Sequence, residues 1–138
     1  MPIGEANVTR EGEHLTLIAY SRMTVEAEKA ADALHHSGIT CDVVDLRTLA
    51  PLDADTIAAS VEKTGRALIV CEDCRTAGVS AEIMARVMEE CFDFLQAPVR
   101  RVAAADTPVP CADALEKAAL PDAAKIIEAA TTLLREYS

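Results

Sequence analysis

The chain has 138 residues, 51% of them hydrophobic, and this length predicts one domain, residues 1–138, whose core needs neither disulfides nor a metal. Its formal net charge of −10 excludes a nucleic-acid-binding protein, because contacts to phosphates require clustered Lys and Arg; it favours a basic partner or solubility alone. There is no apolar run of the ~20 residues that cross a bilayer and no recognisable signal peptide, so we expect a cytoplasmic protein without membrane contact.

The first expected element is a β-hairpin made of two strand-like segments, residues 6–10 and 14–20, with Gly12 in the connection between them. The first strand would run antiparallel to the sheet that the second strand joins, and it would lie at a sheet edge. Helical spacing of alanines then predicts a helix that begins at Ser21 or Thr24 and ends at Ser37, before Gly38.

A second strand and helix come from residues 41–53, which read C-D-V-V-D-L-R-T-L-A-P-L-D. The β-branched first half predicts a buried strand, and Asp53 or Asp55 can cap a helix over residues 53–64. Arg47 and Thr48 follow the carboxyl end of this strand, where open α/β sheets place functional groups. A polar loop without a function is the alternative interpretation.

Residues 67–71 lack charged side chains, which is typical of a central strand with helices on both faces. Ser80 can cap the helix that follows. The apolar stripe of that helix consists of Ile83, Met84, Val87, Met88 and Cys91. Residues 99–103 include two adjacent arginines and predict a strand near a sheet edge.

Prolines make residues 106–110 extended, and a short helix over residues 112–118 is expected after them. The last helix starts near Pro121, and its inner face would consist of Ala123, Ile126, Ile127, Ala130, Leu133 and Leu134. This alternation predicts an α/β fold: a three-layer α/β/α sandwich of about five strands, mostly parallel, with an antiparallel first strand from the N-terminal hairpin.

Motifs for common chemistry are absent. The loops contain no glycine-rich phosphate motif, since Gly65 and Gly78 each stand alone, and no Gly-x-Ser-x-Gly turn occurs. The Cys71-Glu72-Asp73-Cys74 run has no second C-x-x-C or H-x-x-x-H pair to complete a zinc site. We therefore assign no catalytic, cofactor-binding or metal residues, and we expect a domain that serves a larger assembly.

A thiol redox function for Cys71 and Cys74 is the alternative from a different functional class. The two carboxylates between these thiols would raise their pKa, and Cys71 ends a buried strand, so this arrangement disfavours an attacking thiolate. The odd number and irregular spacing of the five cysteines predict reduced thiols.

Seven short motifs run along the chain in order. They are P-I-G-E-A at residues 2–6, R-E-G at 10–12, D-L-R-T-L-A-P-L-D at 45–53, K-T-G-R at 63–66, G-V-S-A-E-I at 78–83, A-P-V-R-R-V at 97–102 and D-T-P-V-P at 106–110. Together they resemble the C-terminal domain of transketolase-like, thiamine diphosphate-dependent enzymes. Within that group the chain looks most like the beta subunit of the decarboxylase component of 2-oxo acid dehydrogenase complexes, of the pyruvate type.

This resemblance implies a five-stranded fold whose first strand is antiparallel. It also implies thiamine diphosphate and Mg in the full assembly, held by a preceding pyrimidine-binding domain and by the alpha subunit, with none bound by this domain. The chain would match the last two-fifths of such a beta subunit, as an excised domain or a natural fragment. The C-terminal domain of a 1-deoxyxylulose-5-phosphate synthase or a transketolase is the sibling interpretation.

The implied partners are the alpha subunit, a second beta subunit, and the basic subunit-binding domain of the acyltransferase core. Charge complementarity fits the last of these, because the chain is acidic. The candidate interface residues are Arg47, Thr48, Glu89, Glu90, Asp93, Gln96, Asp106 and Ser138. Gln96 departs from the family pattern, which often has an acidic residue before the Ala-Pro pair.

Overall fold

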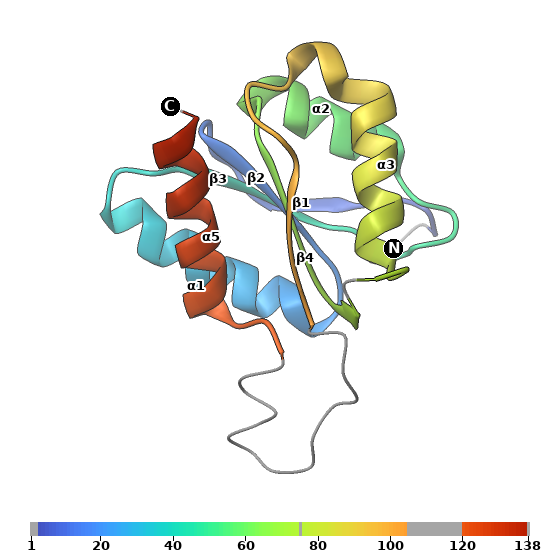
Figure 1. The fold of residues 1–138 in the computed structure, drawn as a ribbon. Coiled ribbons are helices and arrows are strands. Elements are labelled where there is room, and N and C mark those ends of the chain that lie inside the picture. Colours follow the sequence, from blue (N-terminus) through green and yellow to red (C-terminus); the bar gives the residue numbers. More distant parts are fainter. Residues whose placement is uncertain (1–2, 75, 105–119, 138) are drawn as a thin grey trace.

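The computed structural model describes residues 3–74, 76–104 and 120–137 (Figure 1). In these ranges one sheet has the strand order β1-β3-β2-β4-β5. Its strands are β1 (Asn7–Arg10), β2 (Leu15–Ala19), β3 (Cys41–Asp45), β4 (Ala67–Cys74) and β5 (Arg100–Ala104). β1 pairs antiparallel with β3, and every other pairing is parallel. The expected antiparallel edge strand and the edge position of the last strand are both confirmed.

Helices cover both faces of this sheet. α1 (Arg22–His36) and α5 (Ala123–Glu136) lie on one face, and α2 (Ala54–Thr64) and α3 (Val79–Cys91) lie on the other (Figure 1). A short 3₁₀ helix, η1 (Phe92–Phe94), extends α3. The three-layer α/β/α sandwich is therefore confirmed. The segments expected at residues 106–110 and 112–118 lie outside the described residues.

The expected N-terminal hairpin is wrong, because β3 lies between β1 and β2. The connection from β1 to β2 crosses the start of β3. There, the backbone N–H of Gly12 donates to Asp42 Oδ1 at 2.7 Å, and the backbone N–H of His14 donates to the carbonyl of Thr40 at 2.9 Å. A Cβ on Gly12 would lie 2.2 Å from the backbone nitrogen of Cys41, so only glycine fits this crossing.

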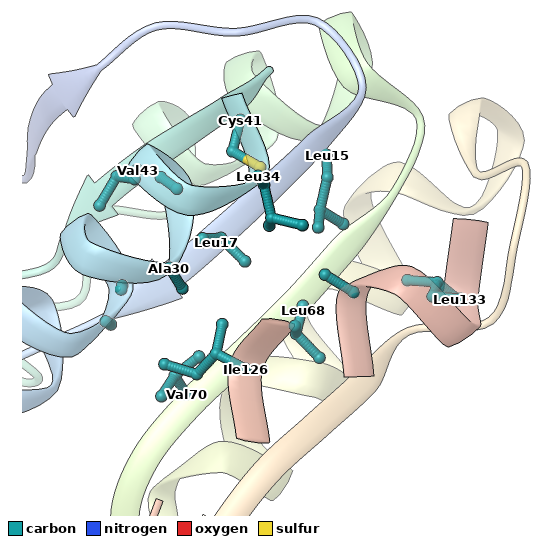
Figure 2. Close-up of a cluster of buried hydrophobic side chains, with 14 of the residues drawn as sticks. Leu15, Leu17, Ala30, Leu34, Cys41, Val43, Leu68, Val70, Ile126 and Leu133 are labelled. Carbon is teal, nitrogen blue, oxygen red and sulfur yellow. The ribbon is translucent and has the colours of Figure 1, made fainter. Parts of the chain in front are cut away.

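Strand alternation sends side chains to two separate cores. Leu17 of β2 and Leu68 of β4 point toward α1 and α5, where they meet Ala30, Ile126 and Leu133 (Figure 2). The remaining members of this core are also small or aliphatic. Alanines on α1 allow the helix to approach the sheet closely, so this face is closely packed and apolar.

The opposite face combines an apolar core with a buried polar network. Asp42 is 1% exposed, and its carboxylate accepts from Ser60 Oγ at 2.6 Å and from Lys63 Nζ at 2.7 Å, besides the N–H of Gly12. Thr16 Oγ1 lies 2.8 Å from Ser60 Oγ and 2.7 Å from Thr64 Oγ1. The network thus joins β2, β3 and α2 through directional bonds.

The helix starts show which local predictions hold. Asp53 caps α2, because its carboxylate accepts from the backbone N–H of Thr56 at 3.1 Å. The expected cap at Ser80 is wrong: Gly78 precedes the first turn of α3, and Ser80 is buried within it. Met88 was expected in the apolar stripe of α3 but is exposed, since Val87 and Cys91 occupy the inward positions.

Candidate functional site

Arg47 and Thr48 lie just beyond the carboxyl end of β3, as expected. Arg47 has a left-handed backbone (φ 59°), its N–H donates to Asp45 Oδ1 at 3.1 Å, and its Nε lies 3.9 Å from Asp45 Oδ2. Thr48 Oγ1 donates to the carbonyl of Pro51 at 3.1 Å. A left-handed non-glycine residue costs about 1–2 kcal/mol, and the bonds to the Asp45 carboxylate offset part of this cost.

The segment before β1 packs on the same loop. The backbone N–H of Ala6 donates to Asp53 Oδ2 at 2.8 Å, and a Cβ on Gly4 would lie 2.9 Å from Pro51 Cγ. Hydrogen bonds from Thr56 and then Ala6 lower the pKa of Asp53. One carboxylate therefore caps α2 and ties down the start of the described chain.

The carboxyl ends of β2 and β4 carry a second polar group. The hydroxyl of Tyr20 donates to Asp73 Oδ2. The pKa of Tyr20 is raised, mainly by burial and in second place by this hydrogen bond. Arg22 Nη2 lies 3.7 Å from Glu72 Oε2. We call Tyr20, Arg22, Asp45, Arg47, Thr48, Glu72 and Asp73 the carboxyl-edge surface. This surface carries both positive and negative side chains, which are held by contacts to one another.

The other candidates lie at the opposite end of the strands. α3 runs back from the carboxyl ends to the amino ends, where Glu89 and Glu90 of its last turn and Asp93 of η1 are exposed. Phe92 and Phe94 are exposed beside them. We call Glu89, Glu90, Phe92, Asp93, Phe94 and Gln96 the amino-edge surface. The sequence interpretation identified its acidic residues and missed its aromatic ones.

Gln96 packs on the end of α2. Its backbone N–H donates to the carbonyl of Gly65 at 2.8 Å. Its side-chain Nε2 lies so close to Gly65 that a Cβ built on this glycine would be only 2.8 Å from it. The candidate interface residues thus form two groups at opposite ends of the sheet rather than one site. Asp106 and Ser138 lie outside the described residues.

The buried thiols are poorly suited to redox chemistry. Burial raises the pKa of Cys41 to about 11, and it also raises the pKa of Cys71 and Cys91. Cys71 is a free, fully buried thiol within β4, which continues to Cys74 instead of ending at Cys71. A thiol in this state has little thiolate at neutral pH and little access to a partner.

Ligand groups for a metal are not brought together in the described ranges: no three His, Cys, Asp or Glu side chains there could hold one ion. Within those ranges, no helix has the length and apolar character to span a membrane. The candidate functional features of the described residues are therefore the carboxyl-edge surface and the amino-edge surface.

The fold is an α/β sandwich with an antiparallel first strand, and its candidate residues lie at both ends of the strands. These features place the chain in the class of three-layer α/β domains. The family model for the C-terminal domain of transketolase matches residues 4–126. The chain belongs to this family of transketolase C-terminal domains.

Individual relatives refine this assignment. The chain is 48% identical over 132 residues to the pyruvate dehydrogenase E1 component subunit beta of Bacillus subtilis, covering 96% of the chain and 40% of that protein. It is 46% identical over 130 residues to the mitochondrial subunit beta-2 of Oryza sativa, covering 94% of the chain and 35% of that protein. The chain thus spans about two-fifths of the length of these relatives.

Among solved structures, a split gene transketolase, described as an inactive beta4 tetramer, superposes with a TM-score of 0.85. The match covers 100% of this chain and 44% of that chain at 26% identity. The fold is therefore shared well beyond the pyruvate dehydrogenase subunits.

Proposed function

We propose that the chain is the C-terminal domain of the beta subunit of a thiamine diphosphate-dependent decarboxylase component of a 2-oxo acid dehydrogenase complex, of the pyruvate type. The observation that carries this proposal is the 46–48% identity to pyruvate dehydrogenase E1 beta subunits over nearly the whole chain. The protein would act in the cytoplasm, as part of an oxidoreductase, and would not be catalytic by itself.

In this proposal the domain serves assembly and docking. The carboxyl-edge surface would contact another domain or subunit of the same enzyme, either the alpha subunit or a second beta subunit. The amino-edge surface would receive the basic subunit-binding domain of the acyltransferase core, consistent with Glu89, Glu90 and Asp93 and with the net charge of −10. Thiamine diphosphate and Mg would be bound by the other parts of the assembly.

The sibling proposal is a domain of a transketolase or a 1-deoxyxylulose-5-phosphate synthase, and the TM-score of 0.85 to a split gene transketolase favours it. The higher identity to pyruvate dehydrogenase subunits, 48% against 26%, supports the first proposal. The redox alternative is disfavoured by the buried Cys71 thiol and its raised pKa.

Reconstitution tests the proposed function. The chain would be joined to the pyrimidine-binding part of a related beta subunit, combined with the alpha subunit, and assayed for pyruvate decarboxylation. We expect activity with pyruvate from the reconstituted enzyme, and neither activity nor calorimetric binding of thiamine diphosphate from the 138-residue chain alone. Binding of the cofactor to the isolated chain would refute the proposal, and activity only with a ketose phosphate would support the sibling.

Arg47→Ala tests the carboxyl-edge surface in the same reconstituted enzyme. Loss of this guanidinium should weaken assembly, seen as dissociation at higher subunit concentrations in sedimentation experiments. Arg86→Ala is the matched control, because within the described residues Arg86 forms an exposed 3.8 Å ion pair with Glu82 on α3. Equal behaviour of the two variants would remove Arg47 from the interface.

A further inference from the structure

The chain contains two phenylalanines, and both lie in η1 with their side chains in solvent: Phe92 is 66% exposed and Phe94 is 50% exposed. Most of the hydrophobic area of a large aromatic residue is normally buried, and aromatic residues are enriched among the residues that dominate binding energy. This chain, which has few aromatic residues, therefore exposes both of its phenylalanines within the three residues of η1.

Local packing prevents these rings from turning inward. Cys91, directly before Phe92, is 1% exposed and fills the inward position at the end of α3. On the other side, the backbone N–H of Leu95 donates to the carbonyl of Phe92 at 3.3 Å, and Ala97 is buried. Since both flanking positions are anchored in the core, the outward direction of Phe92 and Phe94 is fixed by the fold.

The charges around the rings indicate which partner covers them. Glu89, Glu90 and Asp93 are all exposed, and they lie within the same turn and a half of chain as the two rings. A second copy of this chain would bring these carboxylates against one another, whereas a basic partner would pair with them. Charge therefore favours a cationic partner over self-association.

We propose that Phe92 and Phe94 are the apolar anchors of the amino-edge surface and that they insert into a basic partner domain with an apolar pocket, while Glu89, Glu90 and Asp93 form a charged rim. This inference rests on the docking role in the proposed function and deepens it. The rings supply affinity through slow dissociation, and the rim supplies fast, salt-dependent association.

The test measures binding to the 138-residue chain by calorimetry and surface plasmon resonance. One probe is the subunit-binding domain of the acyltransferase core of a bacterial pyruvate dehydrogenase complex. The other is a short amphipathic peptide of Lys and Leu at helical spacing, with a Glu and Leu peptide as its control. Three variants are compared. The phenylalanine variant combines Phe92→Ser with Phe94→Ser, and the charge variant combines Glu89→Gln, Glu90→Gln and Asp93→Asn. The control is Val25→Ser on α1, because Val25 is similarly exposed and lies away from the amino-edge surface.

We expect the phenylalanine variant to bind both cationic probes roughly 30-fold more weakly with an unchanged salt dependence. The charge variant should lose the salt dependence, Val25→Ser should bind like the original chain, and thermal unfolding should be similar for all of them. If only the peptide binds, and binds through the rings, the docking partner of the proposed function is wrong and this inference stands. Unchanged affinity of the phenylalanine variant, no binding of either probe, or self-association that the phenylalanine variant abolishes would each overturn it.

Discussion

The two faces of the sheet are stabilised by different physical means. The face under α1 and α5 is packed with aliphatic side chains (Figure 2). The face under α2 and α3 also buries the Asp42 carboxylate with Ser60, Thr16, Thr64 and Lys63. Aliphatic packing contributes free energy in proportion to buried area and has no preferred direction. Hydrogen bonds to a buried carboxylate fix geometry, because misplacing any donor leaves a costly unpaired group.

The difference teaches which helix position the sequence specifies most tightly. α1 packs its alanine stripe on the sheet by apolar contact, and its polar contacts, such as the bond from the backbone N–H of Ala123 to Glu26 and the ion pair of Arg22 with Glu72, lie outside that apolar core. On α2, by contrast, Ser60 and Lys63 both bond the buried Asp42 carboxylate. The strictly positioned helix is also the one whose end contacts Gln96 of the amino-edge surface.

The largest expected effect comes from the aliphatic face. Leu17→Ala should lower the free energy of unfolding by about 3–4 kcal/mol, because Leu17 is fully buried and the surrounding core relaxes only in part around the cavity. Urea denaturation measures this. Leu49→Ala, at a partly exposed loop position, is the control and should cost less than 1 kcal/mol, roughly. Similar losses in both variants would mean that the aliphatic face is not a tightly packed core.

Asp42→Asn should have the next largest effect, about 2–3 kcal/mol, since an amide cannot accept from Gly12, Ser60 and Lys63 together. Asp55→Asn, exposed in the first turn of α2, is the control with a matched change of charge. If the two variants unfold at the same urea concentration, the polar network contributes nothing to stability and the contrast between the faces fails.

Thr16→Val keeps the shape of the side chain and removes the hydroxyl that bridges Ser60 and Thr64, so we expect a loss of about 1–2 kcal/mol. Combined with Asp42→Asn, the losses should be less than additive, because both changes act on Ser60. Strict additivity in this double-mutant cycle would show that the hydroxyls do not act as one network.

Asp53→Ala should have the smallest effect, about 1 kcal/mol at pH 7, through loss of the α2 cap. Because the folded-state pKa of Asp53 is lowered, its stabilisation is present above the unfolded-state pKa and is lost as pH falls through the folded-state value. Unfolding measured from pH 7 to pH 2.5, roughly, should therefore show the original chain and the variant converging in stability at the acid end. A constant difference over this range would contradict the assigned cap.

Periodicity was sufficient to predict the layers of this fold. The apolar runs of β3 and β4 and the alanine spacing of α1 gave the correct strands, helix and inward faces. The pairing of the strands could not be predicted from the local sequence. Residues 6–10 and 14–20 look like a hairpin, and only the tertiary contact of Gly12 with β3 shows that they do not pair. Exposure was equally hidden, since no local pattern marks Phe92 and Phe94 as exposed, and only the fold shows that Cys91 occupies the inward position.

The crossing of the β1–β2 connection over β3 has a consequence for the order of events during folding. β1 pairs with no strand next to it in the chain; its partner residues, from Val43 to Asp45, are made only after α1 is complete. During synthesis β1 therefore has no partner strand until β3 is made, and we expect it to join the sheet after β2, α1 and β3 have formed a parallel unit. Pulse-labelling hydrogen exchange should find the amides of β1 protected after those of β2, and the reverse order would refute this sequence of steps.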